Sequence, residues 1–440
     1  MADQQAQAAA ARPYPAPVLD VVDYELLFDC VHCGLCLESC PTYLLTRAEM
    51  DSPRGRIYLM KSLAEGRVTL DREAVSHLDS CLGCRGCETA CPSGVHYGRL
   101  LERAREYVER HHQRGLADAI RRAAVRAIFP YPARLRAIIA PLRAADRLKM
   151  RPLIRRLVPR ALREWIDLLP RFAQAERLYP EGPPPGPGAP TAVVHHGCVA
   201  QVLTPSENRN AERVLRAAGY EVVQLERTVC CGALDLHDGN LRRGLDFARQ
   251  NVRAFKRCAA HSIVSAASGC AAAIASYGEL LKGDPEFADD ASEVSSRATD
   301  ISTLVLNRHG LAARLECTAT YHDSCHLAHG MGVRAAPRRL LGSIAGVRMV
   351  EMAESDVCCG SAGSYNLLEP EMARGLAQRK ADNIEATGAE YVVLGNPGCE
   401  FQIARELRRR GSRTRVIHLA DFLALCAQDA DASINAVASG

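Results

Sequence analysis

Eight of the 19 cysteines fall into two short runs that share one spacing. The first run spans Cys30–Pro41, with cysteines at positions 30, 33, 36 and 40. The second spans Cys81–Pro92, with cysteines at positions 81, 84, 87 and 91. Both runs fit Cys-x2-Cys-x2-Cys-x3-Cys-Pro, the pattern with which bacterial ferredoxins bind 4Fe–4S clusters. Because thiolates are soft ligands that suit iron–sulfur clusters, the two runs predict two 4Fe–4S clusters.

In paired runs of this kind the fourth cysteine normally binds the other cluster. The expected ligand sets are therefore Cys30, Cys33, Cys36 and Cys91 for one cluster, and Cys81, Cys84, Cys87 and Cys40 for the other. This crossing explains how runs that begin at positions 30 and 81 can form one compact unit. A pair of structural zinc sites is the competing interpretation, but zinc usually takes its ligands as two separated pairs.

The segment Asp51–Arg56, with the sequence Asp-Ser-Pro-Arg-Gly-Arg, lies between the runs and has two compatible interpretations. Its arginines can place positive charge beside reduced, negatively charged clusters and so tune their potentials. It is also a typical helix start, with Ser52 as the N-cap and Pro53 in the first turn. We expect His32 to lie at the surface or behind the ligands, and not among them.

A second cysteine pattern occurs twice in the C-terminal part of the chain. Each copy has a cysteine and, 32 or 33 residues later, a Cys-Cys-Gly. A Gly-Cys follows, whose cysteine lies 39 or 40 residues after the second cysteine of the Cys-Cys-Gly. Spacings that agree to within one residue indicate a duplication, and we expect the copies to span residues 191–308 and 317–427. Their cysteines are Cys198, Cys230, Cys231 and Cys270 in the first copy, and Cys325, Cys358, Cys359 and Cys399 in the second.

The four cysteines of each copy are expected to meet, because residues just past the carboxyl ends of parallel strands converge at one edge of a sheet. Four soft ligands favour a bound metal in at least one copy, either a further cluster or zinc. A buried thiol cluster and a redox disulfide are the alternatives, although adjacent cysteines seldom pair because the ring is strained. We expect three neighbouring histidines to be structural, and the three remaining cysteines to be ordinary buried thiols: His196, His322, His326, Cys258, Cys317 and Cys426.

The chain divides into segments of different composition, and its length favours two to four domains. Residues 1–18 are rich in Ala, Gln and Pro and are expected to be disordered. Residues 19–100 hold the two cysteine runs and are expected to form a ferredoxin-type domain. Residues 101–178 are rich in Arg and Leu with a helical periodicity that is expected to be interrupted at Pro130, Pro132, Pro141, Pro152 and Pro159. The Pro- and Gly-rich residues 179–190 form a linker.

Each copy of the Cys-Cys-Gly pattern is expected to form an α/β domain. In the first copy, residues 192–196 and 221–225 are short β-prone runs, separated by a helical stretch over residues 206–218 that ends at Gly219. The second copy has Gly346 just before its second expected strand. Strands separated by helices of this length predict a parallel sheet. The expected fold is therefore mixed, with helical segments followed by two duplicated parallel-sheet domains.

Charge and hydropathy limit the function classes. A net charge of +4 gives no reason to expect nucleic acid as a partner. The sequence shows neither a signal peptide nor a spanning apolar segment, so we expect a cytoplasmic protein with at most peripheral contact to the inner face of the membrane. Residues 101–172 hold 18 Lys and Arg against 7 Asp and Glu. This segment is either a surface for anionic lipid or an acidic partner, or a solvated connector, and its prolines favour the connector.

Taken together, the cysteine runs, the Asp-Ser-Pro-Arg-Gly-Arg segment between them and the two Cys-Cys-Gly copies resemble the iron–sulfur subunit of glycolate oxidase. The similarity covers about residues 20–427, and the eight cysteines of the runs correspond one for one to that family's cluster ligands. The resemblance implies an α-helical ferredoxin domain. It also implies a complex with FAD-binding subunits that oxidise glycolate to glyoxylate and pass electrons to a quinone.

The Cys-Cys-Gly copies are also similar to the catalytic subunit of heterodisulfide reductase, in which the last motif is Cys-x-x-Cys. In that family these cysteines hold non-cubane clusters. Here the positions of the last cysteine are occupied by Ala273 and Gln402, which argues against a cluster of that type.

Three functions remain open. The first is the electron-transfer subunit of a flavin-dependent 2-hydroxy-acid dehydrogenase, with glycolate favoured over D-lactate. The second is the equivalent subunit of anaerobic glycerol-3-phosphate dehydrogenase, and the third is a disulfide reductase. Because the sequence has no Gly-x-Gly-x-x-Gly fingerprint or other cofactor motif for substrate chemistry, we expect that chemistry, and the FAD, to belong to partner subunits.

Overall fold

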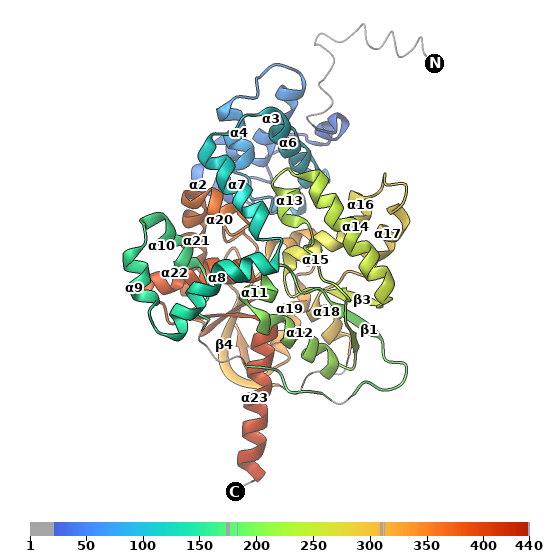
Figure 1. The fold of residues 1–440 in the computed structure, drawn as a ribbon, viewed down its shortest axis with the longest axis vertical. Helices are drawn as coiled ribbons and strands as arrows, with labels where there is room; N and C mark the ends of the chain where they lie inside the picture. Colours follow the sequence, from blue (N-terminus) through green and yellow to red (C-terminus); the bar gives the residue numbers. More distant parts are fainter. Residues whose placement is uncertain (1–21, 173–176, 183, 309–310, 312, 439–440) are drawn as a thin grey trace.

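The computed structural model describes residues 22–172, 177–182, 184–308, 311 and 313–438. The expected disordered segment, residues 1–18, lies outside the described residues. A helical N-terminal part sits on one end of the molecule, a group of helices follows along one side, and two α/β domains form the rest (Figure 1). This is the mixed architecture that the sequence predicts.

Short helices and long loops build the N-terminal part. Its elements are η1 (Tyr24–Asp29), α2 (Pro41–Thr46), η2 (Glu49–Asp51), α3 (Pro53–Ala64), α4 (Arg72–Asp79), α5 (Gly86–Thr89) and α6 (Tyr97–His111). Ser52 caps α3 by accepting a hydrogen bond from the backbone N–H of Gly55, so the predicted helix start is confirmed. Met60, Leu78 and Leu100 are fully buried in the core between α3, α4 and α6. Cysteines of both runs pack against this core.

Four helices form the connector: α7 (Leu116–Ile128), α8 (Pro132–Arg147), α9 (Arg151–Leu157) and α10 (Arg160–Leu168). Most of its prolines lie at helix boundaries, as expected, but Pro141 lies inside α8 and does not end it. Ala137, whose carbonyl would be the helical acceptor for residue 141, is exposed, as is Pro141. Water can therefore bond to the carbonyl that the proline leaves without a donor.

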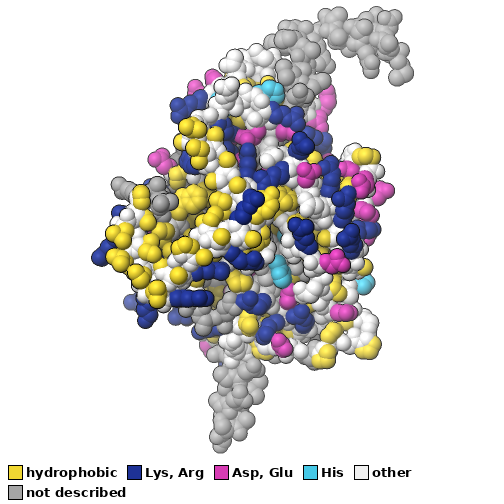
Figure 2. All heavy atoms as spheres, in the orientation of Figure 1, with side chains coloured by type: hydrophobic (Ala, Val, Ile, Leu, Met, Phe, Trp, Pro, Cys, Tyr) yellow, Lys and Arg dark blue, Asp and Glu magenta, His cyan; other side chains and the backbone are white. Residues whose placement is uncertain are grey.

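Connector arginines bind the first α/β domain. Arg122 and Arg126 both pair with the carboxylate of Asp238, the latter with its Nε atom 2.6 Å from Oδ2. The same helices also expose large apolar side chains, among them Ile138, Leu153 and Leu157. On this face, hydrophobic and basic side chains lie interleaved over α8, α9 and α10 (Figure 2).

The first α/β domain contains a three-stranded parallel sheet in the order β2-β1-β3. Its strands are β1 (Thr191–Val194), β2 (Glu221–Val223) and β3 (Ser262–Val264), and its helices are α11 (Ala200–Leu203), α12 (Pro205–Ala217), α13 (Ala233–His237), α14 (Leu241–Cys258), α15 (Ser268–Ala275), α16 (Tyr277–Leu280), α17 (Ala288–Ser296) and α18 (Ile301–Leu306). Gly219 adopts φ +83° directly after α12, and Tyr220 N–H bonds to Leu215 O behind it at 3.0 Å. The predicted helix end is therefore confirmed.

The second α/β domain repeats this arrangement in a four-stranded parallel sheet with the order β5-β4-β6-β7. Its elements are β4 (Arg314–His322), η3 (His326–Gly330), α19 (Ala335–Gly342), β5 (Ala345–Met349), α20 (Tyr365–Leu368), α21 (Pro370–Ala386), β6 (Tyr391–Leu394), α22 (Pro397–Arg410), β7 (Arg415–His418) and α23 (Leu419–Ala438). Strands β1, β2 and β3 correspond to β4, β5 and β6. Gly346 lies within β5 rather than before it, since pairing with β4 starts at Ala345.

The two domains share one apolar core. It contains Ala192 and Val194 of β1, Tyr321 of β4 and Phe422 of α23. Helix α23 packs against α12 of the first domain and β4 of the second. The two copies of the duplication therefore pack against each other through this core.

Candidate metal centres

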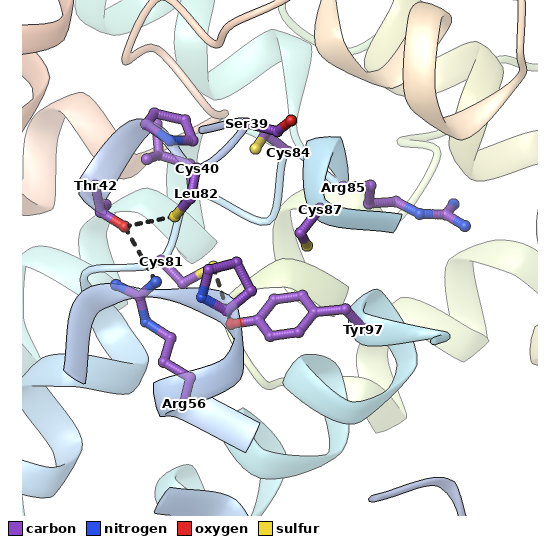
Figure 3. A pocket seen from close by; sticks show the side chains of 12 residues that line it. Ser39, Cys40, Thr42, Arg56, Cys81, Leu82, Cys84, Arg85, Cys87 and Tyr97 are labelled. Carbon is purple, nitrogen blue, oxygen red and sulfur yellow. Dashed lines mark hydrogen bonds between the residues drawn. The ribbon is translucent and has the colours of Figure 1, made fainter. Parts of the chain in front are cut away.

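Four cysteines drawn from both runs line one small cavity in the N-terminal part (Figure 3). They are Cys40, Cys81, Cys84 and Cys87, called here the inner cysteine set. Cys40 belongs to the first run and lies with three cysteines of the second, which is the crossed grouping that the run spacing predicts. Four thiols around one space are the donor set that a 4Fe–4S cluster requires, so the residues present fit that group.

Local backbone geometry turns these cysteines toward the cavity. Cys40 is the N-cap of α2, where Pro41 begins the helix. In the second run Gly83 adopts φ +64°, a conformation that glycine adopts at little cost. A Cβ atom on Gly86 would lie 3.1 Å from the backbone oxygen of Ser39, so the glycine lets the two runs approach each other closely.

Polar contacts surround the sulfurs of the inner set. The hydroxyl of Tyr97 donates to Cys81 Sγ at 3.5 Å, and the Cys40 sulfur lies 3.2 Å from the hydroxyl of Thr42. The backbone N–H of Gly83 also donates to Cys81 Sγ at 3.5 Å. Hydrogen bonds to sulfur are one of the means by which a protein sets the reduction potential of a cluster.

The predicted cation beside the inner set is Arg56. Its guanidinium is fully buried and donates to Asp51 O at 2.6 Å and to Thr42 Oγ1 at 3.1 Å. Burial by itself lowers the pKa of Arg56, but the nearby Cys81 and Cys40 raise it overall. A buried positive charge needs such partners, and Figure 3 shows the guanidinium on the Cys40 and Cys81 side of the cavity.

Burial raises the pKa of the Cys84 and Cys87 thiols well above their usual value. Thiol ligands must lose their protons when they bind a metal. A cluster bound by the inner set would therefore displace protons from these thiols as it forms.

The other four cysteines of the two runs, Cys30, Cys33, Cys36 and Cys91, are called here the outer cysteine set. Burial, together with the charges of Cys91 and Cys33, raises the pKa of Cys30, so Cys91 of the second run reaches the first run. Cys33 is exposed, whereas the other three are half-buried. Arg54 donates to the backbone oxygen of His32 at 3.0 Å and so places a second cation beside this set.

The first-domain set, Cys198, Cys230, Cys231 and Cys270, gathers beyond the carboxyl ends of β1, β2 and β3. The sulfurs of Cys198 and Cys230 lie 3.5 Å apart. A hydrogen bond with Cys230 lowers the pKa of Cys231, but a hydrogen bond with Cys270 and burial raise it overall. The convergence that a parallel sheet predicts therefore occurs, and it brings four thiols together.

The second-domain set, Cys325, Cys358, Cys359 and Cys399, gathers in the same way beyond β4, β5 and β6. The thiol of Cys358 interacts with those of Cys325 and Cys359, and the thiol of Cys359 interacts with that of Cys399. His322 joins this set, because its ring nitrogen and the sulfurs of Cys359 and Cys399 all lie within 4.8 Å of one another.

The other two histidines are bound to protein groups, as expected. His196 Nε2 lies 2.7 Å from Glu212 Oε1, and His326 Nε2 lies 3.3 Å from Gly83 O. His322 differs from them, and its position beside two thiols could not be read from the sequence, since it depends on how β4 packs against the loop after β5.

The two positions that lack a fifth cysteine serve the fold. Ala273 packs with Cys231 and Cys270. Gln402 is fully buried, donates to Ala373 O at 2.9 Å and accepts from Asn366 Nδ2 at 3.3 Å. The nitrogen and the oxygen of its amide are therefore both engaged in hydrogen bonds within the domain.

The inner set borders the second-domain set. Cys84 packs in one apolar cluster with Cys325 and Cys358, and the charge of Cys358 contributes to raising the pKa of Cys84. The hydrogen bond from the ring of His326 to Gly83 O crosses the same boundary. Sequence reasoning missed this contact, because no signal in either segment indicates which cysteine loops are neighbours.

Comparison with known families agrees with this arrangement. Residues 27–95 match the family described as a 4Fe-4S dicluster domain, and residues 192–275 and 319–404 each match the family described as a cysteine-rich domain. The chain is thus an iron–sulfur protein in which a dicluster domain precedes a pair of cysteine-rich domains.

Individual relatives identify the family more closely. The chain is 36% identical over 413 residues to the probable glycolate oxidase iron-sulfur subunit of Bacillus subtilis, an alignment that covers 90% of this chain and 93% of the relative. It is 36% identical over 399 residues to the glycolate oxidase iron-sulfur subunit of Escherichia coli, covering 89% and 92%. The chain belongs to the glycolate oxidase iron–sulfur subunit family.

More distant similarities extend over parts of the chain or over the fold alone. Lactate utilization protein A of Oceanobacillus iheyensis is 28% identical over 229 residues, which cover 51% of this chain and 93% of that protein. A crystal structure of a hypothetical protein from Helicobacter pylori superposes with a TM-score of 0.57 at 10% identity, covering 92% of this chain and 74% of that one. The latter shows a shared fold.

Within the part of the chain that the structure describes, no helix has the length and apolar character needed to span a membrane.

Proposed function

We propose that this chain is the electron-transfer subunit of a flavin-dependent 2-hydroxy-acid dehydrogenase, with glycolate as the donor that partner subunits oxidise. The observation that carries the proposal is the order of the cysteine sets. The outer set opens to solvent at Cys33, the charge of Cys40 in the inner set acts on Cys36 of the outer set, and the second-domain set borders Cys84. Clusters bound at such sets supply one-electron carriers, which can drain a two-electron flavin in single steps.

In this proposal the eight cysteines of the two runs hold two 4Fe–4S clusters in the crossed sets. The residues around them then have distinct tasks. Arg54 stands beside the outer set and Arg56 beside the inner one, so each set has its own cation to offset the charge of its thiolates. The hydroxyl of Tyr97 is hydrogen-bonded to the sulfur of Cys81, and the hydroxyl of Thr42 to the sulfur of Cys40.

The FAD is assigned to the partner subunits, because the relatives are named as subunits of an oxidase. The partner is expected to dock at the outer set. Large apolar side chains flank Cys33 there, with Val31 68%, Leu35 62% and Phe28 54% exposed. Exposed apolar side chains beside a set that opens to solvent are the kind of surface that a protein partner covers.

The acceptor is assigned to a quinone-type molecule, and the connector is the surface through which contact with a membrane would occur. Its exposed Leu153 and Leu157 lie on α9 together with Arg155 and Arg156. The ion pairs of Arg122 and Arg126 with Asp238 favour the simpler role, a spacer anchored to the first α/β domain. Co-sedimentation with anionic liposomes at low salt separates the two roles, since a spacer stays in the supernatant.

The decisive experiment isolates the intact complex through a tag on this chain, under anaerobic conditions, and adds glycolate, D-lactate or glycerol 3-phosphate. Glycolate is expected to reduce the iron–sulfur centres, as seen by low-temperature EPR, and to do so only when the flavin subunits are present. Reduction by glycerol 3-phosphate but not by glycolate would make glycerol 3-phosphate the donor. If no donor reduced the centres through the flavin subunits, and the complex reduced disulfide substrates, the chain would belong to a disulfide reductase.

D-Lactate is the second candidate donor, because a relative that aligns with half of this chain is named a lactate utilization protein. The disulfide-reductase alternative is disfavoured, because the fifth-cysteine positions hold Ala273 and a Gln402 whose amide is already bonded within the protein.

A further inference from the structure

Two buried histidines occupy matched positions in the duplicated domains. His195 lies three residues before Cys198 at the end of β1, and His322 lies three residues before Cys325 at the end of β4. Both rings are fully buried. If both histidines only supported the fold, their rings would be expected to make the same contacts. The contacts of the two rings differ.

Both ring nitrogens of His195 are used by the backbone. Its Nε2 atom lies 2.9 Å from the carbonyl oxygen of Val229, and its Nδ1 atom accepts a hydrogen bond from Gly197 N at 3.3 Å. The ring therefore presents no free nitrogen to the first-domain set.

Only one nitrogen of His322 is used in this way. Its Nδ1 atom lies 3.1 Å from the carbonyl oxygen of Ser355. Because a carbonyl only accepts, Nδ1 carries the proton and the neutral ring keeps a lone pair on Nε2. That Nε2 atom is buried and has no hydrogen-bond partner among the described residues. One ring nitrogen of His322 and the sulfurs of Cys359 and Cys399 lie within 4.8 Å of one another. Because Nδ1 is bonded to Ser355 O, Nε2 is the nitrogen left to act with the two sulfurs.

This arrangement has the features of a metal ligand. Imidazole nitrogen and thiolate sulfur bind thiophilic metals such as zinc and the iron of clusters. A histidine that binds a metal almost always donates its other ring N–H to a carboxylate, a water or a backbone carbonyl, which sets the tautomer and the ring orientation. Ser355 O occupies that position for His322.

We propose that the second α/β domain holds a thiophilic metal centre in which Nε2 of His322 is a ligand, together with the thiolates of Cys359 and Cys399, whereas the first-domain set offers only sulfur. The metal is zinc or the iron of a cluster. The remaining thiols of the set, Cys325 and Cys358, lie on the side of the inner set, next to Cys84. The inference concerns the metal alone and is independent of which flavin subunit is the partner.

Lys380 lies next to the proposed centre. Its ammonium group donates to Ser355 O at 3.3 Å and to Glu354 O, so it contacts the same carbonyl that orients His322. It is buried, and its charge interacts with the thiols of Cys358 and Cys359. A buried cation next to buried thiolates offsets their charge.

The first domain has an amide in the matching place. Asn251 lies 20 residues after Cys231 in α14, and Lys380 lies 21 residues after Cys359 in α21. Asn251 donates to Cys230 O at 2.8 Å and to the hydroxyl of Tyr277 at 3.2 Å. The two domains therefore differ both in the imidazole and in the charge that faces the thiols.

The test measures metal in the full-length chain purified anaerobically, as iron, zinc and labile sulfide per chain. His322→Ala is compared with the matched variant His195→Ala. We expect wild type to hold metal beyond the eight irons of two 4Fe–4S clusters. His322→Ala is expected to lose at least half of that additional metal and to keep the eight irons, and His195→Ala is expected to keep both.

X-ray absorption at the zinc or iron edge identifies the metal and its ligands. A nitrogen scatterer at the distance of a metal-bound imidazole, about 2.0–2.1 Å for zinc, is expected in wild type and His195→Ala and absent from His322→Ala. Zinc and iron both support the proposal, since each is bound by the same donors. Wild type without additional metal overturns it, as does a His322→Ala protein whose metal content and spectrum equal those of wild type.

His322→Cys covers the case in which the alanine variant does not fold. It supplies a thiolate in place of the imidazole and is expected to keep the additional metal with an all-sulfur spectrum. A spectrum identical to that of wild type would contradict ligation by His322.

Discussion

The hydroxyl of Tyr365 donates a hydrogen bond to the backbone oxygen of Ser80, 2.8 Å away. Ser80 immediately precedes Cys81 of the inner set, and Tyr365 follows the second Cys-Cys-Gly by five residues. The bond therefore ties the loop of one cysteine set to the loop of another. Together with the contact of His326 with Gly83 O, it holds Cys84 against Cys358.

Removing this bond tests how firmly the two loops are joined. Tyr365→Phe leaves the Ser80 carbonyl without its donor, so we expect the free energy of unfolding to fall by about 1–3 kcal/mol. Anaerobic denaturant titration, followed by cluster absorbance, measures the change. Tyr58→Phe is the matched control, because Tyr58 is exposed and its hydroxyl accepts only from Arg67 at 3.2 Å; equal losses in the two variants would count against a tie between the loops.

The two arginines of the Asp51–Arg56 segment are expected to act on different centres. Arg56→Gln removes the cation beside Cys40 and Cys81, and the reduction potential of the inner centre should become more negative, because reduction adds negative charge there. Arg54→Gln should lower the potential of the outer centre instead. EPR-monitored redox titration of both variants, with Arg56→Lys as the charge-preserving control, measures each potential; a shift of the same centre by both variants would refute the assignment.

The crossed ligand sets predict which centre each fourth cysteine serves. Cys40→Ala should damage the inner centre and leave the outer one, so that about four of the eight irons in the two clusters are lost. Cys91→Ala should do the reverse, giving a different residual EPR signal. Cys317→Ala is the control, since Cys317 lies in the apolar core of the α/β domains. If Cys40→Ala and Cys91→Ala left the same residual signal, the sets would not be crossed.

The exposed apolar side chains beside the outer set are expected to bind the flavin partner. Leu35→Glu introduces a charge beside Cys33, and we expect partner affinity to fall at least tenfold, which corresponds to about 1.4 kcal/mol. Leu153→Glu changes an equally apolar exposed side chain on α9 and serves as the control. Binding of the purified flavin subunit to an immobilised chain measures both. Should only the α9 variant weaken binding, the docking surface lies on the connector.

Local features were predictable from the sequence for a physical reason. Ligands separated by two residues are gathered by a few backbone dihedral angles, so the grouping within each run depends on nothing distant. The cap at Ser52 and the helix end at Gly219 also depend on neighbouring residues alone, and both are confirmed. The duplication follows from spacing, and the strand order β2-β1-β3 recurs as β5-β4-β6.

Details that depend on the surroundings of a residue, such as its exposure to solvent or its pairing partner, were less predictable. Pro141 was expected to interrupt a helix, yet α8 continues through it on a face open to solvent. Gly346 lies inside β5 because pairing with β4 begins one residue earlier. In both cases the outcome depends on what surrounds the residue, which a local pattern does not contain.

The cysteine spacing is enough to predict the donor atoms, the two-copy architecture and the family resemblance. Which sets are neighbours, and which histidine faces a set, depends on tertiary packing. His195 and His322 stand at the same distance from their cysteines, but the carbonyl that orients each ring comes from Val229 or Ser355, more than 30 residues further along the chain. The His195 ring donates from Nε2 and its Nδ1 lone pair accepts from Gly197 N, so no lone pair is left for a metal. The His322 ring donates from Nδ1 and keeps the lone pair on Nε2.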